Sequence, residues 1–261
     1  MAVIAVTSGT PGAGKTTVAT NLAAVLGRVQ RRVVLFDATP GPSVAARRLG
    51  LFERLDQTAC SGGLRVVTPN VRPAGRGLTA IQAAELAQFI RALATEADHV
   101  IVDMATFSKS VASLVANVDA IALVSTTHQP ATHRAVSVIH RMRTTGSRAP
   151  IGLVVNGMTD HEDGERAFRV VADAARRRFN QTVEAYGAVT ADPDVARAQM
   201  MQRAVVDCRP DAPASRCFEA LARRIANRGP SGGGGLSRFP QSDWDTALSP
   251  SYRPLEARQC A

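Results

Sequence analysis

The sequence predicts an α/β protein with a mostly parallel, twisted sheet and helices on both of its faces. Short apolar runs alternate with stretches of helical periodicity along most of the chain. The apolar runs are nearly continuous, which is typical of strands that are covered on both faces. Three of these runs end in a polar residue, namely Asp37, Asp103 or Asn156. Because ligands of such sheets bind at the carboxyl ends of the strands, these residues mark the expected site.

The first elements form a strand, a helix and a second strand. Residues 2–7 read AVIAVT, an uninterrupted apolar run that predicts a buried strand. Residues 17–26 place apolar residues three and four positions apart, which predicts a helix with one apolar face. Residues 32–37 (RVVLFD) predict a buried strand that ends in a carboxylate. A shorter strand follows at residues 64–67 (LRVV).

The middle of the chain repeats this alternation. Residues 78–97 carry apolar side chains along one side of a helix, and residues 99–103 (HVIVD) form the next strand. Residues 120–124 (AIALV) predict a further strand, and a helix is expected at about 131–145. Residues 151–156 (IGLVVN) predict a strand that ends in an amide. Strands that alternate with helices of this length indicate parallel pairing.

The last elements are a helix at residues 165–179, a strand at 183–189 and a helix at 215–226. Glycine, proline and serine interrupt the pattern from residue 229 onward. We therefore predict one folded domain at residues 1–228 and a flexible tail at residues 229–261. The tail contains four scattered apolar residues, Leu236, Phe239, Trp244 and Leu248. They leave open a role in partner docking or in weak contact with a membrane surface. Pro240 would interrupt an amphipathic helix and therefore argues against a strong membrane anchor.

Residues 9–16 (GTPGAGKT) match in full the G-x-x-x-x-G-K-[ST] pattern of a phosphate-binding loop. A strand precedes the motif and a helix follows it, so backbone N–H groups and a helix N-terminus face an anion. The motif predicts that Lys15 contacts the β- and γ-phosphates of a nucleoside triphosphate and that the Thr16 hydroxyl binds Mg²⁺. The alternative is a glycine-rich turn without a ligand.

Lysine is rare in this chain. Only Lys15 and Lys109 occur among many arginines. A lysine is a compact point charge, whereas arginine presents a planar fork. In an arginine-rich chain, a lysine within the loop therefore indicates a chemical requirement at residue 15.

The polar strand ends supply the remaining candidate ligands. Asp103 has the position of a carboxylate that holds Mg²⁺ through water, and Asp37 is a candidate for the same shell. The alternative for each is a turn residue or a helix N-cap. Asn156 is a candidate for hydrogen bonding to the base, with an Asx-turn as the alternative.

The composition limits location and partners. The net charge of +9 comes mostly from arginine, which favours anionic partners such as DNA or lipid surfaces, although solvated helix faces explain it equally well. No run approaches the ~18 apolar residues of a membrane span. The chain opens directly in a strand, so we expect no signal peptide. Its four cysteines form no C-x-x-C pair, so we expect reduced thiols that bind no metal and a cytoplasmic location.

Several segments resemble the ParA/MinD family of P-loop ATPases over residues 2–228. They read VIAVTSGTPGAGKTTVATNLA, RVVLFDA, HVIVD and LVVN. Within that family, RAFRVVADAARRRF, YGAVTADPDV and VVDCRPDAPASRCFEALA are most similar to the FlhG/FleN group of MinD-like regulators of flagellar number. The resemblance implies a dimer that holds ATP between its subunits and is reset by hydrolysis.

The resemblance also implies roles for individual residues. Lys15 and Asp103 become the catalytic candidates, with Mg²⁺ at Thr16, Asp103 and Asp37. Asn156 and the loop around Asp192 would contact adenine. The phosphates would lie on the loop residues Gly9, Pro11, Gly12, Ala13, Gly14, Lys15, Thr16 and Thr17.

The chain departs from the family pattern at four places. Thr10 stands where the family has a lysine that crosses the dimer interface, and Thr39 stands where it has a second aspartate. Residues 104–107 read MATF in place of a Pro-Ala-Gly segment, and Thr190 replaces a proline. Because loss of one preorganised charge donor costs roughly 10²–10³ in rate, we expect ATP binding with weak or absent hydrolysis. Lys109 is a candidate substitute for the missing lysine, or a surface lysine at a helix start.

Three functions remain open at this level. The first is a dimerising, ATP-responsive switch that regulates flagellar number or placement through a transcriptional activator or a flagellar assembly factor, with weak or no membrane association. The second is a ParA-like positioning or partition ATPase on nonspecific DNA, bound through Arg176, Arg177, Arg178, Arg223, Arg224 and Arg228. The third is an accessory protein of pilus or cellulose-export machinery.

Overall fold

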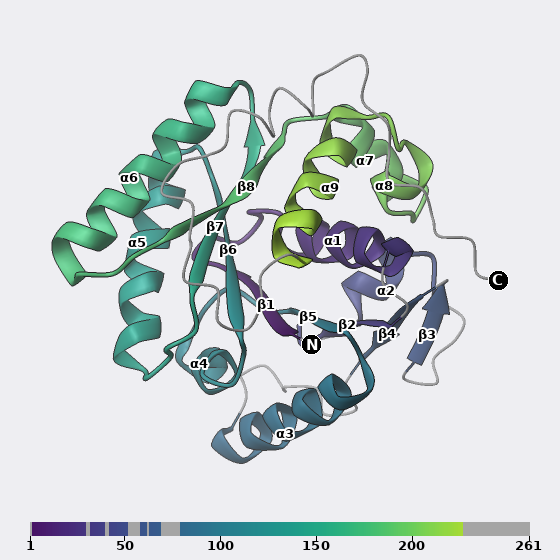
Figure 1. Cartoon of the computed structure of the whole chain (residues 1–261), viewed down its shortest axis with the longest axis horizontal. Coiled ribbons are helices and arrows are strands. Elements are labelled where there is room, and N and C mark those ends of the chain that lie inside the picture. Colours follow the sequence, from purple (N-terminus) through teal and green to yellow (C-terminus); the bar gives the residue numbers. More distant parts are fainter. Residues whose placement is uncertain are drawn as a thin grey trace.

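The computed structural model describes residues 2–29, 32–39, 42–51, 58–61, 63–68 and 79–226. In this part of the chain the strands form one sheet of eight strands in the order β3-β4-β2-β5-β1-β6-β7-β8 (Figure 1). All neighbouring strands pair in parallel except β3, which is antiparallel to β4. The strands are β1 (Ala2–Ser8), β2 (Val33–Asp37), β3 (Thr58–Ser61), β4 (Leu64–Val67), β5 (His99–Asp103), β6 (Ala120–Thr126), β7 (Ile151–Met158) and β8 (Glu184–Thr190). The predicted fold class is confirmed.

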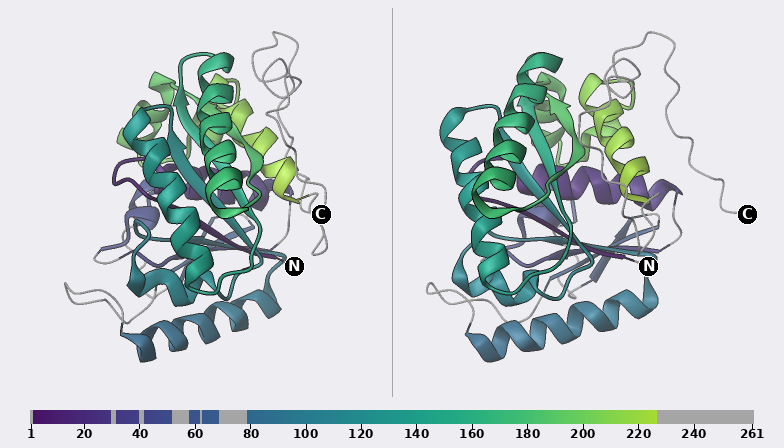
Figure 2. Two further views of the ribbon diagram at one scale, coloured as in Figure 1. Left: turned by 90° about the vertical axis from the view of Figure 1, so that its left-hand side faces the viewer. Right: turned by 60° about the vertical axis from the view of Figure 1, so that its left-hand side comes forward.

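Helices cover both faces of this sheet. The helices are α1 (Lys15–Val29), α2 (Val44–Arg48), α3 (Ala80–Glu96), α4 (Lys109–Val115), α5 (Gln129–Thr144), α6 (His161–Phe179), α7 (Pro193–Met200), α8 (Val205–Cys208) and α9 (Pro213–Ala226). One hydrophobic core lies between the sheet and α3 to α6, and a second lies between the sheet and the remaining helices. Figures 1 and 2 show the sheet between these two layers.

Strand β1 explains why both layers are needed. Its side chains alternate between the faces, so Val3 and Ala5 enter the core under α3 to α6, while Ile4 and Val6 enter the core under α1. Each of these side chains is at most 5% exposed. A strand that buries both faces gives the continuous apolar run that the sequence shows.

The long predicted elements agree with the structure to within a few residues, whereas short elements were missed. Strand β3 and helices α2, α7 and α8 were not predicted, because four to eight residues contain too few turns or alternations to give a periodic signal. Of α4, only the start at Lys109 was expected, and the helix begins there. The predicted tail at residues 229–261 lies outside the described residues. Within the described residues, no helix is long and apolar enough to cross a membrane.

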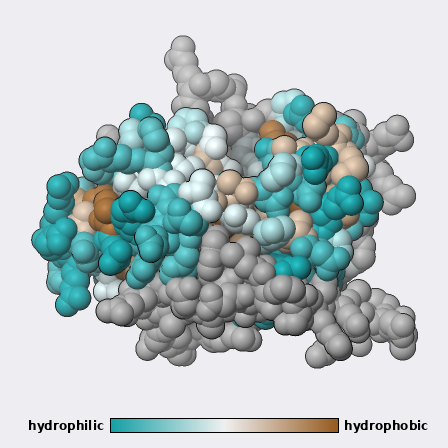
Figure 3. Space-filling view, turned by 90° about the horizontal axis from the view of Figure 1, so that it is seen from above, coloured by the Kyte–Doolittle hydropathy of each residue, from teal (hydrophilic) through white to brown (hydrophobic). Residues whose placement is uncertain are grey.

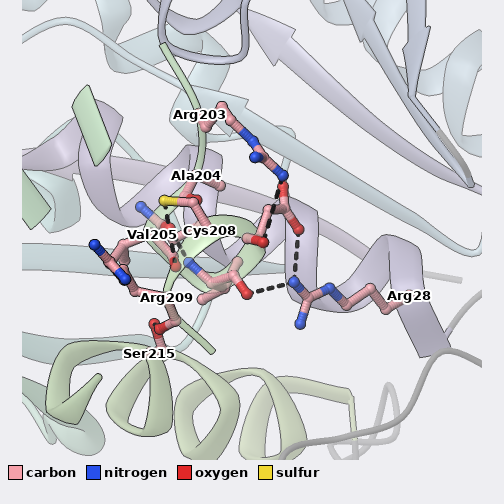
Figure 4. A network of polar contacts seen from close by, with 10 residues as sticks. Arg28, Arg203, Ala204, Val205, Cys208, Arg209 and Ser215 are labelled. Carbon is pink, nitrogen blue, oxygen red and sulfur yellow. Dashed lines mark hydrogen bonds and ion pairs between the residues drawn. The ribbon is translucent and has the colours of Figure 1, made fainter. Parts of the chain in front are cut away.

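A polar network fixes α8 against α1 (Figure 4). Arg28 of α1 donates to Asp207 Oδ1 at 2.7 Å and to the carbonyl oxygen of Val206. At the start of α9, Ser215 Oγ donates to the carbonyl oxygen of Arg209 at 2.6 Å. These bonds hold α8 against α1 and tie the start of α9 to the residue that follows α8.

Candidate nucleotide-binding site

The loop between β1 and α1 has the backbone geometry that the motif predicts. Gly12 and Gly14 adopt φ angles of +75° and +91°, which favour glycine. A Cβ atom on Gly14 would also lie 2.2 Å from Asn156 Nδ2. Asn156 Nδ2 donates to the carbonyl oxygen of Ala13 at 3.0 Å. The end of β7 therefore packs directly on the loop.

A cavity of about 450 Å³ opens above this loop. It brings together seven of the residues predicted to bind nucleotide, namely Gly12, Gly14, Lys15, Thr16, Thr17, Asn156 and Asp192. Thr190, Ala191 and Val195 continue the wall toward α7. The phosphate loop and the predicted adenine loop thus face one space.

Gly9, Pro11 and Ala13 do not line this cavity. Gly9 instead lies against α5, where a Cβ atom would be 2.8 Å from the carbonyl oxygen of Arg134. The close approach of two backbones is a sufficient reason for glycine at this position. Contact of these three residues with phosphate stays a prediction.

Asp192 shapes the wall of the cavity with its carboxylate. Oδ1 accepts from the N–H of Asp194 at 2.9 Å and caps α7, and Oδ2 accepts from the N–H of Ala214 at 3.0 Å. Both oxygens are therefore engaged within the protein. We infer that the loop offers its backbone and surface, rather than this carboxylate, to a base.

Lys15 lies at the start of α1 and points toward the segment after β5. Its Nζ donates to Thr106 Oγ1 at 3.2 Å. Burial lowers the pKa of Lys15 below its ordinary value, and the nearby Asp103 carboxylate partly opposes that shift. A half-buried ammonium held by one neutral hydroxyl keeps donors available for an anion.

Asp103 is fully buried at the end of β5. Among the described residues, neither of its carboxylate oxygens has a hydrogen-bond partner. Burial and the charge of Asp37 raise the pKa of Asp103 to about 7, although Thr16, Lys15 and Arg48 oppose this. A bare carboxylate near the Thr16 side chain fits Mg²⁺, which binds carboxylate and hydroxyl oxygens directly or through water.

Asp37 has a different environment although it pairs with Asp103 across β2 and β5. Its Oδ1 accepts from the N–H and the hydroxyl of Thr39 at 3.0 and 2.5 Å. Its Oδ2 accepts from Ser43 Oγ at 2.7 Å and the N–H of Ala45 at 3.1 Å. Asp37 therefore organises the turn into α2, and its role in a metal shell stays a prediction.

The segment after Asp103 is fixed to the sheet. Met104 and Phe107 are buried, and Arg141 lies over the Phe107 ring at 5.4 Å. Thr7 Oγ1 donates to the carbonyl oxygen of Ala105 at 3.0 Å, and the N–H of Phe107 donates to Ser8 at 2.9 Å. The other candidate cation, Lys109, begins α4, but its side chain is outside the described part.

Among the long polar side chains of the cavity wall, sequence reasoning missed Arg48 and Gln199. Arg48 donates to Thr17 Oγ1, and Gln199 Nε2 donates to the same oxygen at 3.1 Å. Arg48 lies beyond the motif, in a five-residue helix that the sequence pattern does not predict. No signal in the sequence separates it from Arg47.

A metal site built from histidine and cysteine was not expected. Among the described side chains, no group of three or more His, Cys, Asp or Glu residues has the geometry to hold a metal ion. Cys208 and Cys217 are free thiols, and burial raises the pKa of Cys217 to about 11.

Comparison with known proteins agrees with this geometry. Residues 4–205 match the model of the CobQ/CobB/MinD/ParA nucleotide binding domain. The chain belongs to this MinD/ParA family. A curated relative, the antiactivator FleN of Pseudomonas aeruginosa, is 28% identical, and the alignment covers 85% of each chain.

Solved MinD/ParA structures share the fold. The MinD cell division protein of Aquifex aeolicus superposes with a TM-score of 0.70 at 20% identity, covering 88% of this chain and 98% of that one. MinD from Pyrococcus horikoshii, solved with Mg-ADP, gives a TM-score of 0.65 at 18% identity, covering 86% of this chain and 95% of that one. At these identities the likeness establishes the fold alone.

Proposed function

We propose that this protein is an ATP-binding, MinD/FlhG-like switch that dimerises with ATP and regulates flagellar number or placement through a protein partner. The observation that carries the proposal is the cavity that joins Lys15 and Thr16 to Asn156 and the loop around Asp192. The similarity to an antiactivator FleN supports the choice within the MinD/ParA family.

The roles of the chain's own groups follow from the site. Lys15 and the backbone N–H groups of the loop would bind and orient the phosphates. Thr16 and Asp103 would hold Mg²⁺, which supplies charge neutralisation at the phosphates. Asn156 joins the base side of the cavity to the phosphate side through its bond to Ala13.

An exposed apolar edge beside the cavity supports dimerisation. Met200 and Met201, at the end of α7, are 85% and 49% exposed. Gln199, the residue before them, lines the cavity. Because a second copy that closes over the nucleotide would cover this edge, the exposed methionines fit a surface buried only in the ATP-bound dimer.

Weak hydrolysis is part of the proposal. Thr10 offers no positive charge to a partner subunit, and the Thr39 hydroxyl already donates to Asp37. Met104 and Phe107 anchor the segment after β5 in the core. We expect ATP binding to set the fraction of protein that is dimeric. ATP hydrolysis would be too slow to change that fraction within the lifetime of a complex with the protein partner.

A DNA-associated positioning protein is the second candidate, because α5 and α6 form a basic groove. The groove has a volume of about 720 Å³, and four arginines line it, namely Arg166, Arg169, Arg177 and Arg178. Figure 3 shows the α5–α6 side, on the left, as largely hydrophilic around one small apolar area. Such a surface fits acidic proteins as well as phosphate backbones.

Two of the other arginines expected to contact DNA are engaged within the fold. Arg224 donates to the carbonyl oxygen of Tyr186 at 2.6 Å, and burial lowers the pKa of Arg224 to about 10. Arg223 pairs with Glu219 at 3.5 Å. Arg228 lies outside the described residues. These contacts weaken the DNA interpretation relative to the switch.

The test combines affinity, oligomeric state and phenotype. Purified protein should bind ATP in the presence of Mg²⁺ and run as a dimer in size-exclusion chromatography with light scattering, whereas a Lys15→Ala variant should do neither. Introducing Lys15→Ala into the native host should change the number or position of flagella. Absence of ATP affinity in the unmodified protein would refute the proposal. ATP-dependent, salt-sensitive retention on random duplex DNA, with normal flagella in the variant host, would favour the second candidate.

A further inference from the structure

We propose that Arg48 binds the phosphates of the nucleotide and supplies, from within the same subunit, a positive charge that residue 10 lacks. This inference deepens the proposed function and rests on it. The ligand class is a nucleoside triphosphate, and the new element is a guanidinium contributed by α2.

The position of Arg48 is the first support. It is the last residue of α2, and it lines the cavity together with Lys15, Thr16 and Thr17. The side chain is half-buried, whereas the neighbouring Arg47 is exposed and does not line the cavity. Helix α2 therefore directs the Arg48 side chain toward the cavity and the Arg47 side chain toward solvent.

Helix α2 is held in place at its opposite end. Ser43 Oγ accepts from the N–H of Ala46 at 3.0 Å and caps the helix. Asp37 accepts from Ser43 Oγ and from the N–H of Ala45, at the end of β2. Asp37 thus fixes the short helix that carries Arg48, which gives this strand-end carboxylate a positioning role.

The electrostatic environment of Arg48 is unusual for a cation. Burial lowers the pKa of Arg48 below its ordinary value, while the charge of Asp103 opposes that shift. Among the described residues, Arg48 makes no ion pair, and the partner of its guanidinium is the neutral hydroxyl of Thr17. A guanidinium has five N–H donors in a fixed fork, so most of its donors remain for an anion in the cavity.

The bond from Arg48 to Thr17 also leaves the Thr17 hydroxyl oriented as a donor toward an anion. A hydroxyl has two acceptor lone pairs and one donor. Arg48 and Gln199 both donate to Thr17 Oγ1, so the two lone pairs are occupied and the O–H remains as a donor. Thr17 lines the cavity, and its O–H can therefore donate to the same phosphates.

Substitutions at two adjacent arginines test the assignment. We expect Arg48→Ala to weaken ATP binding about 10- to 100-fold, since a hydrogen bond to a charged group and the orientation of Thr17 are both lost. Arg47→Ala is the matched control and should bind ATP like the unmodified protein. Arg48→Lys should recover part of the affinity, because it restores the charge but not the fork.

The measurements separate this inference from the proposed function and from misfolding. Dissociation constants for ATP come from calorimetry with Mg²⁺, and urea unfolding of each ligand-free variant reports the fold. If Arg48→Ala is unstable, Arg48→Gln replaces it in the test, because glutamine removes the charge but keeps a long side chain. A folded Arg48→Ala or Arg48→Gln protein that binds ATP as tightly as Arg47→Ala would overturn the inference while leaving the proposed function intact. Failure of the unmodified protein to bind ATP would overturn both.

Discussion

Replacing Asp103 by asparagine should stabilise the ligand-free protein increasingly as the pH rises. Burial and the charge of Asp37 raise the pKa of this carboxyl from 3.8 to about 7 in the folded protein. A carboxyl with a higher pKa in the folded state binds its proton more tightly there than in the unfolded chain. The stabilisation by the protonated Asp103 carboxyl is therefore fully present below about pH 4. It decreases as the pH rises and is lost once the pH has passed through about 7.

The magnitude follows from the two pKa values. At ~1.4 kcal/mol per pKa unit, the rise from 3.8 to about 7 corresponds to a loss of ~4 kcal/mol of unfolding free energy once the carboxyl is ionised. Part of that loss has already occurred at pH 5, because the Asp103 carboxyl of the unfolded chain is already ionised at that pH. Asp103→Asn removes the titration, so its stability relative to the unmodified protein should increase by ~2–3 kcal/mol between pH 5 and pH 8.

Urea unfolding with a chelator present, at pH 5 and pH 8, measures this difference directly. Asp37→Asn is the control, because the Asp37 carboxylate accepts bonds from Thr39, Ser43 and Ala45. We expect that variant to lose about 1–3 kcal/mol at pH 5 but less at pH 8, because removing the Asp37 charge also lowers the pKa of Asp103. A stability difference for Asp103→Asn that does not change with pH would show that the carboxylate is not held in the bare, buried environment described. Addition of ATP and Mg²⁺ should stabilise the unmodified protein and have little effect on Asp103→Asn.

Three further substitutions test other parts of the structure. Gly152→Ala should cost about 1–3 kcal/mol in urea unfolding, because its Cβ would lie 1.9 Å from the buried Tyr186 ring; unchanged stability would contradict the packing of β7 against β8. Gly14→Ala should abolish ATP binding in calorimetry, since residue 14 has φ +91° and its Cβ would meet Asn156; full affinity would show that the loop tolerates another geometry. Met200→Ser should leave the unfolding free energy of the monomer within ~0.5 kcal/mol but weaken the ATP-bound dimer in light scattering; an unaffected dimer would place the interface elsewhere.

The sequence was informative where the physical cause is local. The glycine loop and the apolar strands depend on φ angles and on burial of both faces, so a short pattern predicts them. Asp37 and Asp103 show the limit of such reasoning. Both end a parallel strand, yet within the described part of the chain the Asp37 carboxylate accepts bonds from three residues and the Asp103 carboxylate accepts none. Only the path of the chain after each strand decides between these environments.

Arg48 shows the same limit from another side. Its place in the cavity depends on a five-residue helix whose direction is set by side-chain bonds at Asp37 and Ser43. The position of Arg48 relative to the cavity therefore depends on contacts between distant parts of the chain, which produce no periodic pattern in the sequence. The antiparallel strand β3 escaped prediction for a related reason, since four residues at a sheet edge carry almost no alternation.

Helix α5 lies between the phosphate loop and the arginine groove. On one side, the backbone of Gly9 approaches so closely that a Cβ atom would lie 2.8 Å from the carbonyl oxygen of Arg134 and 3.0 Å from Val138 Cγ2. On the other side, His133 and Ser137 line the groove with α6. Because glycine at residue 9 places the two backbones in close contact, a shift of α5 would require the loop to move as well. The arginine groove and the loop between β1 and α1 are thus separated by the width of a single helix.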